Sequence, residues 1–181
     1  MKKLEKCVIL GPSCSGKDFL VRELTKLEFR PLVKFTTRPQ RKGEVEGINY
    51  YFTTEDNINE LDRKGELLTR ETFKVWPKNK PEEIWTYAIT LNEFLFSQVM
   101  ILTPSELKKI RNSDVKQDLF VVYLDINENV RRERLSLRND DNDSISRRIQ
   151  SDHLDFEKFS DYDLKISDPD FEADWILDLM F

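Results

Sequence analysis

The segment VILGPSCSGKDFL constrains the fold of this chain more than any other stretch of its sequence. Residues 11–18 within it match the pattern G-x-x-x-x-G-K-[ST] except at the last position, where Asp18 replaces a Ser or Thr. A short apolar run, residues 6–10, precedes the match, and a helical pattern, residues 17–27, follows it. This order predicts a phosphate-binding loop, with an ordinary strand, turn and helix as the alternative interpretation.

A loop of this kind binds phosphate because its backbone N–H groups point inward and the following helix adds the positive end of its dipole. Gly11 and Gly16 supply a permissive backbone, and Lys17 brings a positive charge to the β- and γ-phosphates. Cys14 is expected to contribute its backbone N–H rather than its thiol. Asp18 has two possible roles. Its carboxylate is stabilised at the helix N-terminus by the helix dipole, or it binds Mg2+, directly or through a coordinated water.

Four further apolar runs, at residues 33–35, 99–102, 119–126 and 164–166, alternate with helical stretches. The alternation predicts an α/β fold with a central parallel sheet flanked by helices. Two segments interrupt it: a long charged one from about residue 37 to 89 with strand-like pieces, and the short polar run RNDDND. We interpret the first as a substrate-binding insertion and the second as a lid.

The overall charge limits the partners of the chain. Its 181 residues suit one domain, and 29 Lys and Arg against 34 Asp and Glu give a net charge of −5. This balance argues against nucleic acid and anionic membranes as partners, so an anion must meet a local cluster of basic side chains. Two cysteines are too few for a disulfide framework or a zinc site and favour a cytoplasmic protein. No apolar stretch approaches the roughly 18 residues of a membrane span.

A second basic constellation lies in KFTTRPQRKGEVEGINYYF. Arg38 and Arg41 lie close together in a turn-prone segment, and paired arginines can hold one phosphate through several charge-assisted hydrogen bonds. The hydroxyl of Tyr50 can add another. Taken alone, the segment would also fit a solvated basic loop.

The phosphate loop followed by T-T-R-P-x-R-x-G-E-x-x-G-x-x-Y-x-F resembles the guanylate kinase family of P-loop nucleoside monophosphate kinases. The resemblance implies that Arg38, Arg41 and Tyr50 hold the phosphate of the acceptor nucleotide and that Glu44 supports them. RLSLRNDDNDSISRRI resembles the family's lid. There the catalytic arginines would be Arg138 and Arg148, with Arg147 as a neighbouring candidate and an exposed charged helix as the alternative.

The resemblance implies a P-loop kinase fold, in one domain over residues 1–181. Its core would comprise residues 1–36, 91–137 and 148–181, its subdomain for the nucleoside monophosphate about 37–90, and its lid about 138–147. Catalysis would rest on Lys17 and the lid arginines, with ATP as co-substrate, Mg2+ as cofactor and small-molecule nucleotides as the partners. The implied ATP-binding residues are Gly11, Ser13, Cys14, Ser15, Gly16, Lys17 and Asp18, the last also as the metal ligand.

The departures from the family lie on the side that would recognise the base. Thr69 stands where the family has a glutamate that reads guanine, with Glu71 nearby, and Lys34 replaces a serine that commonly faces the base. Tyr87 remains from the family's Y-G-[ST]. The implied acceptor is GMP, dGMP or a related, modified deoxynucleotide, with another purine or a pyrimidine left open. The implied acceptor-binding residues are Lys34, Arg38, Arg41, Glu44, Tyr50, Thr69, Glu71 and Tyr87.

Two other functions remain open from the sequence. G-P-S-x-S-G-K-D also resembles the loop of ribose 1,5-bisphosphate phosphokinases, although those relatives typically lack the R-x-G-E-x-x-G-x-x-Y stretch. Non-catalytic guanylate-kinase-like modules that bind phosphorylated proteins keep the Arg and Tyr residues but usually lose the ATP loop and the lid. The sequence leaves the oligomeric state open.

Overall fold

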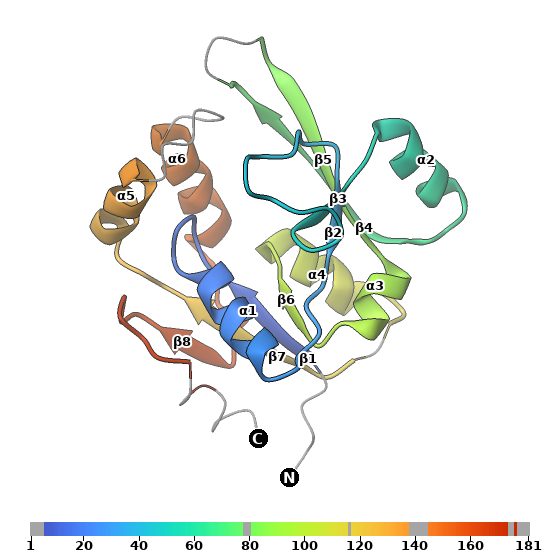
Figure 1. Cartoon of the computed structure of the whole chain (residues 1–181). Helices are drawn as coiled ribbons and strands as arrows, with labels where there is room; N and C mark the ends of the chain where they lie inside the picture. Colours follow the sequence, from blue (N-terminus) through green and yellow to red (C-terminus); the bar gives the residue numbers. More distant parts are fainter. Residues whose placement is uncertain (1–5, 78–80, 116, 138–144, 174–175, 177–181) are drawn as a thin grey trace.

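The computed structural model describes residues 6–77, 81–115, 117–137, 145–173 and 176. A four-stranded parallel sheet forms the core, in the order β6-β1-β7-β8 (Figure 1). Its strands are β1 (Lys6–Leu10), β6 (Val99–Ile101), β7 (Leu119–Leu124) and β8 (Leu164–Ile166). The predicted α/β fold with a central parallel sheet is confirmed, and β1 and β8 have the bounds of the predicted apolar runs. The phosphate loop leaves the carboxyl end of β1, the edge where ligands bind in such sheets.

A second four-stranded sheet, in the order β3-β2-β5-β4, combines strands of the predicted insertion with β2, which precedes the insertion. Its pairs are antiparallel except for β2 with β3. The helix α2 (Glu55–Arg63) lies on the far side of this sheet from the core in Figure 1. The elements of the sheet are β2 (Lys34–Thr36), β3 (Tyr50–Phe52), β4 (Leu67–Val75) and β5 (Glu83–Thr90).

The prediction that residues 33–35 belong to the central parallel sheet is wrong. The strand at this position, β2, pairs with β3 and β5 in the second sheet. Lys34 and Phe35 are only half-buried, unlike the fully buried β1. A short apolar run predicts a strand, but its length and composition do not say which sheet receives it.

Helices cover both faces of the core sheet because alternate residues of β1 point to opposite sides. Cys7 and Ile9 pack with Leu20 and Leu24 of α1 (Lys17–Lys26). Val8 and Leu10 form the other cluster, with side chains of α3 (Leu91–Phe96) and α4 (Pro104–Asn112). Burial raises the pKa of the Cys7 thiol to about 12, so this cysteine is an inert core residue.

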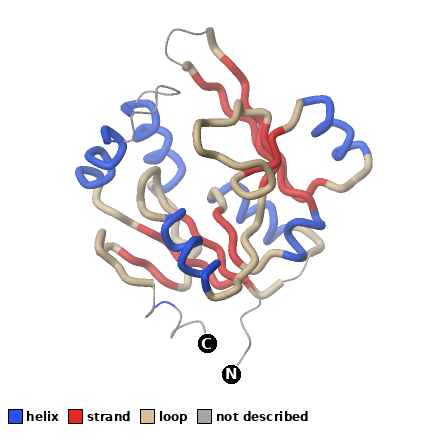
Figure 2. Tube along the Cα trace, in the orientation of Figure 1, coloured by secondary structure: helices blue, strands red, loops and turns tan. Residues whose placement is uncertain are grey.

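Two further helices, α5 (Glu128–Leu137) and α6 (Ile145–Phe156), lie beside the core sheet on the side away from α2 (Figure 2). Most of the predicted lid, residues 138–147, lies outside the described residues, as do the predicted N-cap Ser144 and most of the helix predicted near the C-terminus. Within the described ranges, no helix has both the length and the apolar character needed to cross a bilayer.

Candidate active site

The loop after β1 requires glycine at both of its ends. A Cβ at Gly11 would lie 2.6 Å from Ser15 Oγ and 2.7 Å from the backbone oxygen of Leu124. Gly16 has φ 102° and caps α1, and a Cβ there would approach the ring of Phe171 to 3.2 Å. Both positions favour the residue without a side chain, because of close approach in one case and a left-handed backbone in the other.

Hydrogen bonds fix the side chain of Lys17 and the backbone of this loop. The ammonium of Lys17 donates hydrogen bonds to the backbone oxygens of Gly11 and Pro12, both at 2.7 Å. Cys14 has φ 59°, and its carbonyl accepts a hydrogen bond from Arg134 Nη1 at 3.3 Å. This contact involves the Cys14 carbonyl, so the contribution expected from its backbone N–H stays a prediction. Ser15 is buried within the turn.

A cavity of about 320 Å³ brings the loop together with the second sheet and α6. Such a volume lies at the lower end of small-molecule sites. The loop contributes Ser13 and Lys17, the second sheet and its preceding segment contribute Arg41 and Tyr50, and α6 contributes Arg148. The cavity therefore has basic groups on three sides, although the chain as a whole is acidic.

Glu44 organises the predicted phosphate-binding residues of the acceptor side. Its carboxylate accepts a hydrogen bond from Arg38 Nη2 at 2.7 Å and another from the backbone N–H of Arg41 at 2.7 Å. The Arg38 guanidinium lies 5.1 Å from the ring centre of Tyr50. Arg41 and Tyr50 line the cavity, whereas the buried Arg38 lies outside the described lining and contacts Tyr50.

Two tyrosine hydroxyls of this side remain protonated at neutral pH. Burial raises the pKa of Tyr50, and the positive charge of Arg38 offsets this rise only in part. Burial and the neighbouring Tyr50 likewise raise the pKa of Tyr87, which also lines the cavity. Both hydroxyls can thus donate hydrogen bonds to an anion. Asp18 is an exposed residue in the first turn of α1 and is not among the residues that line the cavity.

The opposite part of the cavity contains a buried charged pair. Lys34 Nζ donates to Glu106 Oε1 at 2.8 Å and to Oε2 at 2.6 Å, with side-chain exposures of 14% and 1%. Glu106 also accepts from the backbone N–H of Thr103 at 2.7 Å, as part of a capping box at the start of α4. The carboxylate is fixed by the helix terminus and in turn fixes Lys34, which lines the cavity.

The structure does not place Thr69 and Glu71 in the described lining. Thr69 is buried, and its Oγ1 has no hydrogen-bond partner among the described residues. The Glu71 carboxylate accepts hydrogen bonds from Thr103 Oγ1 and Lys109 Nζ, each at 3.1 Å. The charge of Glu71 still acts on the cavity through the lining residue Asp155. Burial raises the pKa of Asp155 most, and the negative charges of Asp152 and Glu71 raise it further.

Arg147, in the described part of the predicted lid, and Arg148, which follows it, both line the cavity. The Arg147 guanidinium also lies 5.9 Å from the ring centre of Trp76, on the β4 side. Arg138 lies outside the described residues. The alternative, an exposed charged helix, does not fully describe these two arginines, because both are half-buried and line the cavity.

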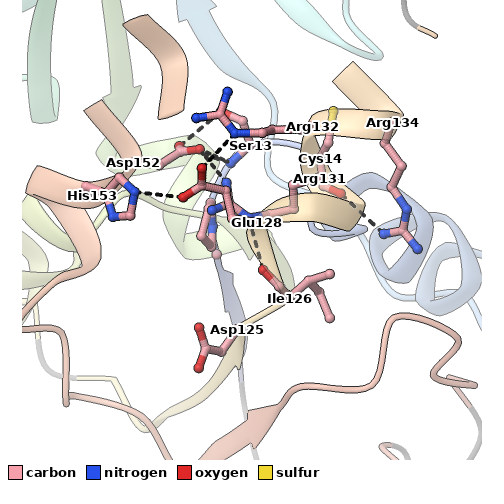
Figure 3. A network of polar contacts seen from close by, with 12 residues as sticks. Ser13, Cys14, Asp125, Ile126, Glu128, Arg131, Arg132, Arg134, Asp152 and His153 are labelled. Carbon is pink, nitrogen blue, oxygen red and sulfur yellow. Dashed lines mark hydrogen bonds and ion pairs between the residues drawn. The ribbon is translucent and has the colours of Figure 1, made fainter. Parts of the chain in front are cut away.

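Asp152 and Arg131 are site residues that the sequence analysis missed. The Asp152 carboxylate contacts Ser13 of the loop and Arg131 of α5 (Figure 3). Arg134 holds the other side of the loop through the Cys14 carbonyl. Helical spacing was the available signal, because Asp152 follows Arg148 by four residues and therefore shares its face of α6.

Comparisons with known proteins agree with this geometry. A family model described as guanylate kinase matches residues 3–176. The chain is 30% identical to the guanylate kinase of Nostoc sp. over 171 residues, which cover 92% of this chain and 83% of the relative. It is 28% identical to the guanylate kinase of Rickettsia felis over 169 residues, or 91% and 85%. Its fold is similar to the crystal structure of guanylate kinase from Anaplasma phagocytophilum, with a TM-score of 0.67, 19% identity and coverage of 99% and 86%.

Proposed function

The chain belongs to the guanylate kinase family and is an ATP-dependent nucleoside monophosphate kinase, and we propose that its acceptor is GMP, dGMP or a related deoxynucleotide with a modified base. One observation carries this proposal. A single cavity contains the phosphate loop, the acceptor-side residues Arg41 and Tyr50, and the buried pair of Lys34 and Glu106.

The loop would hold the phosphates of ATP. Its backbone N–H groups and the N-terminus of α1 attract anions, and Lys17 adds a charge next to the loop carbonyls. On binding, the Lys17 ammonium would exchange these carbonyls for phosphate oxygens. Gly11 and Gly16 keep the backbone close enough to the ligand for this exchange.

The acceptor phosphate would bind to Arg41, Tyr50 and Tyr87, with Arg38 and Glu44 fixing their positions. The transferred phosphoryl group then lies between this cluster and the loop. Phosphoryl transfer depends mainly on alignment and on positive charge around the equatorial oxygens. Lys17 and Arg148 would supply that charge, Arg138 being the further candidate outside the described residues, and neither a covalent intermediate nor a dedicated base is required.

Asp18 is the residue that would hold Mg2+. Among the described residues there is no group of three or more His, Cys, Asp or Glu side chains that could form a complete metal site. Mg2+ commonly takes one or two carboxylates and completes its shell with phosphate oxygens and waters, so a single carboxylate beside the loop fits it. When bound, the ion neutralises phosphate charge. Asp18 would hold it at the first turn of α1.

Lys34 would select the base. An ammonium has three N–H donors, and Glu106 accepts two of them. The third would donate to a keto oxygen such as guanine O6, where adenine carries an amino donor instead. The apolar wall formed by Phe73, Val75 and Trp85 suits a planar base. It does not suit a sugar bisphosphate, so this alternative is disfavoured. The loop and Lys17 likewise disfavour a non-catalytic phosphopeptide module.

The test of base selection replaces Lys34. Lys34→Met should lower kcat/KM for GMP by about tenfold to a hundredfold, as expected for a lost hydrogen bond to a charged group, and leave KM for ATP within about twofold. Because Glu106 would then be a buried unpaired charge, the double variant Lys34→Met/Glu106→Gln provides a second measurement. Lys26→Met, at an exposed lysine of α1, is the control. Equal loss for GMP and AMP in both variants would contradict the proposed role.

We further propose that the protein is cytoplasmic. The support is chemical: both cysteines, Cys7 and Cys14, are free thiols in the structure.

A further inference from the structure

The α6 residue Asp152 contacts the phosphate loop through its carboxylate. The backbone N–H of Ser13 donates to both oxygens of Asp152 at 3.0 Å, and Ser13 Oγ donates to Oδ1 at 3.0 Å. Arg131 Nη1 donates to Oδ2 at 2.8 Å. In Figure 3 the carboxylate of Asp152 points toward Ser13 and Arg131, and dashed lines mark the contacts.

This arrangement has the chemistry of a bound anion. The negatively charged carboxylate is surrounded by a backbone N–H of the loop, a hydroxyl and a guanidinium. These are the donors that hold a phosphate oxygen. Asp152 and Arg131 are nearly buried, at 8% and 5% exposure. Arg131 is itself fixed, because its Nε donates to the Ile126 carbonyl at 3.0 Å. The carboxylate is therefore held firmly and not by a chance surface contact.

Asp152 and a nucleotide compete for the same donor. Ser13 is the third residue of the loop, and its N–H and Oγ–H are both directed to Asp152 in this structure. A second anion beside that carboxylate would be repelled in a cavity of restricted size. Phosphate can thus reach Ser13 only after Asp152 has left it.

We propose that Asp152 is a determinant of ATP affinity, a carboxylate that occupies the phosphate contact of Ser13 and is displaced when the nucleotide binds. This inference rests on the proposed role of the loop as the ATP site. Arg131 stays in place after the displacement, because its Nε is held by the Ile126 carbonyl. Because Asp152 shares one face of α6 with Arg148, its release also couples occupation of the loop to the helix that carries this arginine.

The competing role and a purely structural role predict opposite signs. If Asp152 only braces the loop, its removal should disorganise the loop and weaken ATP binding. If it competes, Asp152→Ala should bind ATP more tightly, by about tenfold for the loss of one charge-assisted contact, which corresponds to about 1.4 kcal/mol. Asp152→Asn should give a smaller gain, since an amide oxygen still accepts from Ser13 but carries no charge.

The experiment is calorimetric titration of the full chain with ATP and Mg2+ at fixed ionic strength. A double variant, Arg131→Met/Asp152→Ala, removes the buried guanidinium that the single variant leaves unpaired, and should keep the gain in affinity. Asp161→Asn, at a half-exposed ion pair with Arg111, is the matched control and should leave ATP affinity unchanged. KM for the acceptor, measured in parallel, should stay within about twofold in all variants, since Ser13 belongs to the loop.

The outcomes separate the two proposals. Tighter ATP binding by both Asp152→Ala and the double variant supports competition. Unchanged or weaker binding in a folded variant overturns it and leaves Asp152 as a brace, while ATP binding by the unaltered chain still supports the proposed function. A gain that disappears in the double variant also overturns it, because Arg131 rather than the freed Ser13 would then bind the phosphate. Absence of ATP binding by the unaltered chain overturns both.

Discussion

Replacing Glu44 with glutamine tests the acceptor side of the cavity, because this one carboxylate positions both arginines. It accepts from Arg38 Nη2 and from the Arg41 backbone N–H, each at 2.7 Å. The side chains of Arg38 and Glu44 are 2% and 17% exposed. Glu44→Gln retains the shape and one acceptor oxygen but removes the charge, so the buried guanidinium of Arg38 loses its compensation.

The expected loss of stability follows from this burial. Breaking a buried ion pair by removing one partner lowers the free energy of unfolding by about 3–5 kcal/mol, and the retained amide oxygen places this variant near about 3 kcal/mol. For a domain of this size, that loss lowers the melting temperature by about 6–12 °C. Glu60→Gln is the control, because the same substitution there affects an ion pair with Lys64 in which both side chains are 53% exposed. It should leave the melting temperature unchanged.

The activity of the same variant should change on one side only. KM for the acceptor nucleotide should rise by about tenfold because Arg41 and Tyr50 lose their support, whereas KM for ATP should stay within about twofold. Thermal unfolding and a coupled assay of ADP release measure the two effects. A Glu44→Gln variant with the melting temperature and acceptor KM of the unaltered chain would refute the reasoning.

Two further predictions concern magnesium and pH. Asp18→Asn should raise the Mg2+ concentration needed for half-maximal turnover, because the carboxylate beside the loop is lost, and unchanged magnesium dependence and turnover in a titration would exclude Asp18 as the ligand. Although burial raises the pKa of Glu44, the hydrogen bonds from Arg38 and from the Arg41 backbone lower it below its ordinary value in the folded chain. The stability that this group adds is therefore complete above its unfolded pKa of about 4.3 and is lost as the pH falls through the folded pKa. Urea unfolding at a series of pH values should show that the free energy of unfolding falls less steeply below this pH in Glu44→Gln than in the unaltered chain. An equal dependence of the free energy of unfolding on pH in both would contradict the prediction.

The sequence predicts the parts of this site that depend on neighbouring residues. The loop, α1 and the cluster of Arg38, Arg41 and Glu44 each lie within a short stretch, where turn and helix chemistry decide the geometry. Motif and local pattern therefore contain the information that places them. The core sheet is predicted for a similar reason, since buried parallel strands are continuous apolar runs.

The remaining contacts depend on how distant elements pack. Lys34 and Glu106 are 72 residues apart, and Ser13 and Asp152 are 139 residues apart. Helical spacing indicates that Asp152 shares a face with Arg148, but it does not say what that face contacts. The prediction for β2 is wrong for the same reason, because an apolar run identifies a strand but not the strands with which it pairs.

The proposed activity is tested by coupled ADP release by the unaltered chain against a panel of ribo- and deoxynucleoside monophosphates. The panel includes modified bases, with ribose 1,5-bisphosphate alongside. Lys17→Ala, which removes the charge of the loop, serves as the inactive control. We expect turnover with GMP, dGMP or a modified deoxynucleotide that carries a keto base, and little turnover with AMP or CMP. Turnover with AMP equal to that with GMP would contradict the role of Lys34, and turnover with the sugar bisphosphate alone would contradict the proposed acceptor.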